Sequence, residues 1–234
     1  MGVIYWAGDS TVQSNNIYTF PQTGLGQELG RYLKAGIRIE NHARNGRSTK
    51  SFLDEGRFGK IMDGLSEGDF LFIQFGHNDE KKEDPSRYTS PQGGYYDNLL
   101  YMAESARKKG AYPVLITPLE RRKFSNGILN GGTHTEYVSA MKKLSSDENI
   151  PLIDLNEKSR CALKEAGDEA SKRWYMHVAP GVYDAYPDGK EDDTHLSCVG
   201  AVVYAGLIAK GLEELGGIYA ELLAKGQDDA DRLQ

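Results

Sequence analysis

The sequence predicts an α/β fold in which helices cover both faces of a parallel sheet. Five short apolar runs, rich in β-branched or aromatic residues, are bounded by turn residues and have the length of buried strands. Segments in which apolar residues recur at helical spacing lie between these runs. Strands that alternate with helices in this way form βαβ units, whose right-handed crossovers place helices on both sides of the sheet.

The expected elements follow one another along the whole chain. Strands are expected at residues 3–7, 37–40, 70–75, 113–117 and 152–155. Helices are expected at residues 25–33, 95–108, 135–144 and 199–215. The remaining long stretches, 120–133 and 174–194, are rich in Gly, Pro and polar residues and are expected to be loops at the functional edge of the sheet. No linker interrupts the pattern, so residues 1–234 are expected to form one domain, with a polar tail at 225–234 that frays.

Composition excludes several function classes. Apolar residues make up 39% of the chain, which is enough for one sizeable core. Lys and Arg number 28 against 34 Asp and Glu, and the net charge of −6 argues against a nucleic acid partner or a polybasic membrane anchor. No run of apolar residues is long enough for a transmembrane helix. No sequence feature predicts an oligomeric state.

The N-terminus and the cysteines predict a reducing compartment. The first ten residues, MGVIYWAGDS, lack the basic stretch, apolar run and cleavage site of a secretory signal. A cytoplasmic location is therefore expected, or a secreted one if a leader has been removed. Cys161 and Cys198 are the only cysteines, and both are expected to be reduced and mostly buried.

Three polar motifs directly follow the first three expected strands. They are GDSTV at residues 8–12, ARNGRST at 43–49 and GHND at 76–79. In open α/β sheets ligands bind beyond the carboxyl ends of the strands, where such loops gather. The three motifs are therefore expected to meet at one edge of the sheet.

Ser10, Asp192 and His195 have the residue types of a catalytic triad. A serine hydroxyl is a poor nucleophile until a base accepts its proton, and the base needs a third group to orient it. Asp192 and His195 are three residues apart, which on a turn or a first helical coil brings both side chains to one face. The carboxylate could then bind Nδ1 and leave Nε2 to Ser10. The alternatives are a GDS turn whose Asp and Ser cap the next helix, and an acidic cluster at a helix N-terminus.

Gly46 and Asn78 could supply donors to the oxygen on which charge develops during acyl transfer. Gly46 offers a backbone N–H that a ligand can approach closely, and Asn78 offers a side-chain amide. The alternatives are that Gly46 only makes a turn and that Asn78 only caps a loop. Their positions after the second and third strands favour the catalytic interpretation.

These motifs together resemble the SGNH, or GDSL-type, hydrolases. The resemblance rests on GDST at Ser10, NHARNGRS at Gly46, GHND at Asn78 and DDTH at residues 192–195, in the family's order. It implies a flavodoxin-like sheet of order 2-1-3-4-5, with Ser10 as nucleophile, His195 as base and Asp192 as its partner. It also implies an oxyanion hole from the N–H groups of Ser10 and Gly46 and the side chain of Asn78, with no metal or other cofactor. Thr11 stands where many members have leucine.

The subgroup that the motifs resemble is the rhamnogalacturonan acetylesterases, which remove acetyl groups from a pectin backbone. GDSTV, NGRSTKSF and GHNDE carry this likeness. It implies an acetylated carbohydrate as substrate. Two alternatives stay open: an esterase for acetylated xylan or short acyl esters, and a non-catalytic flavodoxin-like module that binds a phosphate or flavin.

Asp9, Arg47, His77 and Trp174 are the residues expected to bind substrate. His77 could instead brace its loop, and Trp174 could stack on a sugar or pack its own loop. Loop cations that could meet an acidic sugar are Arg47, Lys50, Arg121, Arg122 and Lys123, although most such side chains are only solvated. His134 and His177 lack partners at metal-ligand spacing, so no zinc site is expected. With Asp192 as the triad acid, Asp193→Ala is expected to be mild.

Overall fold

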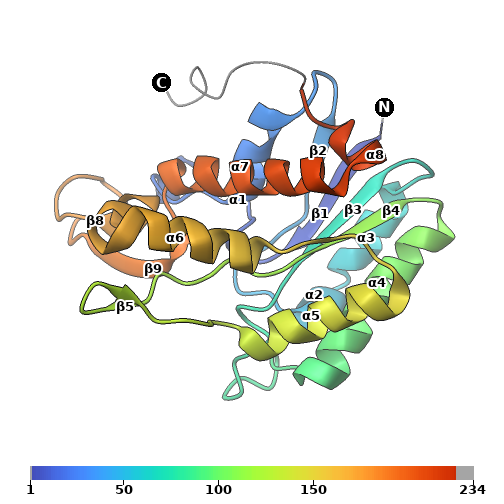
Figure 1. Cartoon of the computed structure of the whole chain (residues 1–234), viewed down its shortest axis with the longest axis horizontal. Helices are drawn as coiled ribbons and strands as arrows, with labels where there is room; N and C mark the ends of the chain where they lie inside the picture. The colour runs from blue at the N-terminus through green and yellow to red at the C-terminus, as the bar shows by residue number, and fades with distance from the viewer. Residues whose placement is uncertain (1, 225–234) are drawn as a thin grey trace.

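The computed structural model describes residues 2–224 and has three layers, a parallel sheet between two layers of helices (Figure 1). Five strands pair in the order β2-β1-β3-β4-β7, and every neighbouring pair is parallel. The strands are β1 (Val3–Gly8), β2 (Arg38–Asn41), β3 (Phe70–Gln74), β4 (Tyr112–Ile116) and β7 (Leu152–Ile153). Counted along the sheet's own strands this is the order 2-1-3-4-5, so the predicted fold class is confirmed. The expectation of fraying at 225–234 lies outside the described residues.

The two faces of the sheet bury different residues of the same strands. In β1, Ile4 and Trp6 belong to one apolar cluster, and Tyr5 and Ala7 belong to the other, as strand alternation requires. Helices that bury the first cluster are α1 (Leu25–Glu28), α6 (Leu155–Ser171) and α7 (Cys198–Leu215). Helices that bury the second are α2 (Thr49–Asp54), α3 (Arg57–Gly64), α4 (Tyr96–Lys108) and α5 (Thr135–Glu148). A last short helix, α8 (Gly217–Ala220), follows α7.

Helix α7 shows why its sequence folds as predicted. Its N-cap is Ser197, whose side chain accepts a hydrogen bond from Gly200 N. Gly200 packs so closely on the backbone of Trp174 that any Cβ there would lie 1.8 Å from the carbonyl oxygen. The helix ends before Gly216, which has a φ of 69°. This close packing fixes the start of α7 against the segment that leads to the predicted catalytic histidine.

Several elements differ from the sequence-based prediction. The helix expected at 25–33 divides into α1 and a 3₁₀ helix (Leu29–Tyr32). Both expected long loops contain hairpins, β5 (Phe124–Ser125) with β6 (Ile128–Leu129) and β8 (Tyr175–Val178) with β9 (Lys190–Leu196). Helices α2, α3 and α6 were not predicted. The first two are short, with 6 and 8 residues, and α6 buries only two large apolar side chains, Leu155 and Leu163.

The cysteines differ from expectation in burial. Both are free thiols, but Cys161 is exposed on α6 and Cys198 is only half-buried at the start of α7. The prediction of mostly buried thiols is therefore wrong for Cys161, and Cys198, the first residue of α7, is only partly buried. No helix within residues 2–224 is both long and apolar enough to cross a bilayer.

Candidate active site

Ser10 lies in a tight turn at the carboxyl end of β1. The turn is closed by the carbonyl of Asp9, which accepts hydrogen bonds from Val12 N and Gln13 N at 3.2 and 3.1 Å. The Asp9 side chain accepts from Thr11, through N at 2.9 Å and Oγ1 at 2.8 Å. The next helices are a 3₁₀ helix (Ile17–Thr19) with Asn16 as its N-cap and α1 with Gly24 as its N-cap, so neither Asp9 nor Ser10 caps a helix. This leaves the hydroxyl of Ser10 available at the edge of the sheet.

The structure brings Ser10, His195 and Asp192 together. The Oγ of Ser10 lies 2.9 Å from Nε2 of His195, and Nδ1 of the same ring lies 2.7 Å from Oδ2 of Asp192. A carboxylate can only accept, so Nδ1 carries the ring proton and Nε2 is free to accept the proton of Ser10. This is the hydrogen-bond order of a nucleophile, its base and the group that orients the base.

A bulge in β9, not a turn or helical coil, places Asp192 and His195 on one face. In a regular strand residues three apart point to opposite faces. Here Met176 pairs with Asp192 while the preceding Tyr175 pairs with Leu196, so residues 193–195 are extra on the β9 side. The expected common face is therefore correct, but its expected cause is wrong.

Asp192 is held ionised by its neighbours. Burial opposes its charge, but the hydrogen bond from the His195 ring and those from the backbone N–H groups of His195 and Thr194 together lower the pKa of the carboxyl well below its ordinary value. Lys190 adds a cation 3.2 Å from Oδ2. The base therefore has a fixed negative partner at neutral pH.

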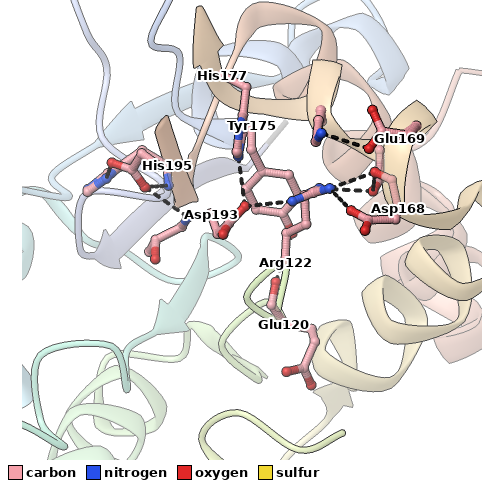
Figure 2. Close-up of polar contacts among 12 residues, drawn as sticks. Glu120, Arg122, Asp168, Glu169, Tyr175, His177, Asp193 and His195 are labelled. Carbon is pink, nitrogen blue, oxygen red and sulfur yellow. Dashed lines mark hydrogen bonds and ion pairs between the residues drawn. The ribbon is translucent and has the colours of Figure 1, made fainter. Parts of the chain in front are cut away.

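Asp193 points away from the His195 ring and belongs to a different network (Figure 2). Its Oδ1 lies 2.9 Å from Nη1 of the buried Arg122 and 2.7 Å from Nε2 of His177. The same guanidinium pairs with Asp168 of α6, and Arg122 N donates to the Asp193 carbonyl at 2.9 Å. These contacts argue against the expectation that Asp193→Ala is mild, since this carboxylate neutralises a buried arginine beside the bulge.

Gly46 and Asn78 lie on the loops that follow β2 and β3. Gly46 has a φ of 77°, a conformation that side chains rarely adopt, which explains why glycine is required. Nδ2 of Asn78 donates one hydrogen to the Arg47 carbonyl at 3.1 Å and keeps its second. Within residues 2–224, the N–H groups of Ser10 and Gly46 donate to no protein acceptor. Three donors are therefore available for an oxyanion.

Two of the predicted substrate residues are buried behind the site. Asp9 is 0% exposed and His77 is 3% exposed. Burial raises the pKa of the Asp9 carboxyl and lowers that of the His77 ring well below its ordinary value. The ring of His77 packs edge-on against His134, with 4.2 Å between centroids. These contacts favour the bracing alternative for His77, and contact of either residue with substrate stays a prediction.

The other two residues that were expected to bind substrate, Arg47 and Trp174, have protein partners. The Arg47 guanidinium binds both carboxylate oxygens of Glu55 at 3.0 Å. Trp174 packs edge-on against Tyr204 of α7 with 6.4 Å between centroids, which favours packing over sugar stacking. Their roles toward substrate stay predictions.

The remaining rim cations are also largely engaged. Lys50 donates to the Pro85 carbonyl at 2.7 Å, and Arg121 pairs with Glu80 at 2.8 Å. Arg122 is buried with Asp168 and Asp193, and Lys123 is exposed. Among residues 2–224, no three His, Cys, Asp or Glu side chains gather in an arrangement that could hold a metal ion.

Comparison with known proteins identifies the family. Residues 7–200 match the GDSL-like Lipase/Acylhydrolase family. The chain belongs to this family. It is 41% identical to the rhamnogalacturonan acetylesterase RhgT of Bacillus subtilis strain 168, over 91% of this chain and 90% of RhgT. It is also 41% identical to the probable rhamnogalacturonan acetylesterase YesY of the same organism, over 95% of this chain and 97% of YesY.

A solved structure shows the same fold. The crystal structure of protein YxiM from Bacillus subtilis superposes with a TM-score of 0.78 at 26% identity, covering 93% of this chain and 57% of the YxiM chain. This GDSL-like hydrolase therefore spans little more than half of that protein's length.

Two residues near the site were missed by sequence reasoning. Asp79 follows Asn78 directly and is fully buried, with Oδ1 accepting from Thr49 N at 3.0 Å and from Thr89 Oγ1 at 2.9 Å. It fixes the Asn78 loop of this GDSL-like hydrolase to the start of α2. The motif GHND contains Asp79, but the sequence assigned roles only to its His77 and Asn78. Arg87 lies beside Gly46, a contact between two loops that no local pattern indicates.

Proposed function

We propose that this protein is a serine esterase that removes O-acetyl groups from rhamnogalacturonan through an acetyl-enzyme intermediate. The contact that carries the chemistry is the 2.9 Å approach of Ser10 Oγ to Nε2 of His195. Two relatives, each 41% identical over nearly their whole length and named as rhamnogalacturonan acetylesterases, support the substrate.

In the first half-reaction Ser10 attacks the acetyl carbonyl while His195 accepts the hydroxyl proton. The hydrogen bond to Asp192 keeps the ring in the tautomer whose Nε2 is a free acceptor, and it stabilises the imidazolium that forms. His195 then gives the proton to the departing sugar oxygen, so the sugar leaves as a neutral alcohol.

Charge on the carbonyl oxygen is stabilised by donors that are already in place. The N–H groups of Ser10 and Gly46 and the second hydrogen of Asn78 Nδ2 are the groups that we assign to it. The hydrogen bond from Asn78 to the Arg47 carbonyl holds the amide in position before substrate arrives. Preorganised donors of this kind act without reorganisation at the moment of reaction.

In the second half-reaction water takes the place of the sugar alcohol. His195 removes a proton from the water, which attacks the acetyl-Ser10 carbonyl, and the same donors hold the oxygen. Collapse of this intermediate returns the proton to Ser10 and releases acetate. Every proton is moved by His195.

Acetate release from purified protein tests the proposal. Wild-type protein and a Ser10→Ala variant are incubated with acetylated rhamnogalacturonan, acetylated xylan and p-nitrophenyl acetate. We expect fastest release from rhamnogalacturonan and loss of about 10³-fold or more in Ser10→Ala on all three substrates. Faster deacetylation of xylan would refute the substrate. Turnover that survives in folded Ser10→Ala protein would refute the mechanism.

A further inference from the structure

A polar hollow of about 400 Å³ opens beside Gly46. This volume lies within the range of ligand sites, about 300–1,000 Å³. The hollow is lined by Asn45, Gly46, Arg47, Ser51, Glu55, Ser86 and Arg87. No apolar side chain is among these residues, so the hollow suits a hydroxylated or charged group and does not suit an acyl chain.

Arg87 is the cation of this hollow that has donors to spare. Its Nε binds Oδ2 of Asp84 at 2.8 Å, and its Nη1 would lie 3.7 Å from a Cβ placed on Gly46. Within residues 2–224, Asp84 is the one acceptor that this guanidinium contacts, which leaves its two Nη groups for a ligand. Two adjacent donors on a planar guanidinium match the two oxygens of a carboxylate.

The loop that carries Arg87 is fixed in place. Asp84 Oδ1 accepts from Ser86, through N at 3.1 Å and Oγ at 2.5 Å, and these bonds keep the pKa of Asp84 below its ordinary value. The charged Asp84 carboxylate in turn orients the Arg87 guanidinium. Lys50 of α2 holds the same loop through the Pro85 carbonyl at 2.7 Å. Arg87 is therefore presented at the hollow by the fold and is not a freely moving surface side chain.

Arg47, which lines the hollow, and the nearby Arg57 and Lys50 leave the local charge positive. Glu55 is shared by Arg47 and Arg57, so one carboxylate faces two guanidinium groups. Lys50 has a carbonyl partner and keeps its charge unpaired. The surroundings of the hollow therefore attract anions although the whole chain carries a net charge of −6.

We propose that this hollow is a subsite for the carboxylate of a uronate sugar, and that Arg87 is the residue that binds it. The inference rests on the proposed function, because the hollow shares Gly46 with the assigned oxyanion hole. A uronate carboxylate on Arg87 holds its sugar chain beside the reacting acetyl group. The serine and asparagine side chains of the lining are donors and acceptors for the sugar's hydroxyls. The subsite thus distinguishes acidic pectic chains from neutral ones such as xylan.

Arg87→Gln tests the subsite by a change in substrate preference. Acetylated rhamnogalacturonan oligosaccharides are compared with the same oligosaccharides after chemical reduction of their carboxylates to alcohols. The measured quantity is the ratio of kcat/KM on the acidic substrate to kcat/KM on the reduced one. We expect Arg87→Gln to lower this ratio by about 10- to 100-fold, the loss of hydrogen bonds to a charged partner. Because both substrates meet the same preparation, partial unfolding of the variant does not change the ratio.

Arg160→Gln is the matched control. Arg160 forms an i,i+3 ion pair with Glu157 on α6, and its side chain is 33% exposed against 35% for Arg87. We expect this control to keep the wild-type ratio. An unchanged ratio in Arg87→Gln, or an equal fall in Arg160→Gln, overturns the subsite.

Inhibition separates the subsite from the proposed function. Unacetylated oligogalacturonate is added to p-nitrophenyl acetate hydrolysis by wild-type and Arg87→Gln protein. We expect the inhibition constant to rise about 10- to 100-fold in the variant, whether or not rhamnogalacturonan is deacetylated. Arg87-dependent inhibition without acetate release from rhamnogalacturonan refutes the proposed substrate and supports the subsite. If acetate is released from rhamnogalacturonan but inhibition does not depend on Arg87, the proposed substrate is supported and the subsite is refuted.

Discussion

Asn78 lies after β3 with its amide fixed to the Arg47 carbonyl, so its role can be isolated by a single substitution. Asn78→Ala removes one of three assigned oxyanion donors and is expected to lower kcat by about 10²- to 10³-fold. KM should change little, because the donor stabilises charge that develops only in the transition state. Steady-state kinetics with p-nitrophenyl acetate measure both constants.

Asn130→Ala is the control for Asn78. Asn130 also uses its side-chain amide in a single hydrogen bond, to Ser125 at 2.8 Å, but it lies in the exposed loop after β6. It is expected to keep wild-type kcat. A rise in KM with intact kcat in Asn78→Ala would contradict the oxyanion assignment and would indicate ground-state binding instead.

Among individual residues, those in contiguous motifs could be predicted and those in contacts between loops could not. Ser10 and Asn78 follow predicted strands, and Asp192 and His195 are near neighbours in sequence, so motif and spacing identify all four. Arg87 approaches Gly46 only because two loops meet at the sheet edge, and a single sequence does not encode that meeting as a pattern.

At the scale of elements, strands β1, β3 and β4 were predictable because buried strands are continuous apolar runs. The two hairpins differ in what their sequences indicate. Strand β9 (Lys190–Leu196) is mostly polar and is bulged, so it shows no regular alternation. The hairpin of β5 and β6 did carry a signal, Asn126-Gly127, whose positive φ values of 52° and 74° are those of a type I′ turn. An Asn-Gly pair between two short segments therefore predicts this hairpin, and the expectation of a loop throughout 120–133 is wrong there.

The link between β9 and α6 yields a prediction for Asp193. Arg122 joins the β9 bulge to Asp168 and Ser171 of α6 through its guanidinium (Figure 2). Asp193→Ala leaves this buried cation with one fewer carboxylate and is expected to lower the free energy of unfolding by about 2 kcal/mol. Urea denaturation measures this loss. We also expect a lower kcat, because the bulge that aligns Asp192 with His195 loses a support.

Two companion variants separate these effects. Asp193→Asn keeps an acceptor oxygen for Arg122 and should recover part of the lost stability. Asp184→Ala removes an exposed carboxylate from the same β8–β9 connection and should leave both quantities unchanged. Wild-type stability in Asp193→Ala would show that Asp168 alone satisfies Arg122.

In contrast, Asp192→Ala should lower kcat by about 10⁴-fold, because it removes the group that fixes the tautomer of His195.

For the molecule as a whole, the buried Asp79 makes stability depend on pH. Burial raises the pKa of this carboxyl from 3.8 to about 7, despite hydrogen bonds from Thr49 and Thr89 that favour the charged form. Between these values the folded chain holds a proton that the unfolded chain has lost. The contribution of Asp79 to the free energy of unfolding therefore falls as pH rises from about 4 to about 7, by up to about 1.4 kcal/mol per unit, and is constant above that range. Asp192 acts in the opposite direction. Because its pKa is lowered in the folded chain, its contribution to the free energy of unfolding rises with pH, but only in more acidic solution.

Asp79→Asn removes this titration while keeping an oxygen to accept from Thr49 and Thr89. The variant should gain stability relative to wild type as pH rises from about 4 to about 7, and the difference should be constant above that. Urea denaturation at a series of pH values measures it. Asp63→Asn, which changes an exposed carboxyl on α3, should follow the wild-type profile. Parallel profiles for wild type and Asp79→Asn would mean that Asp79 is ionised in the folded protein throughout this range, with its charge held by the two threonines.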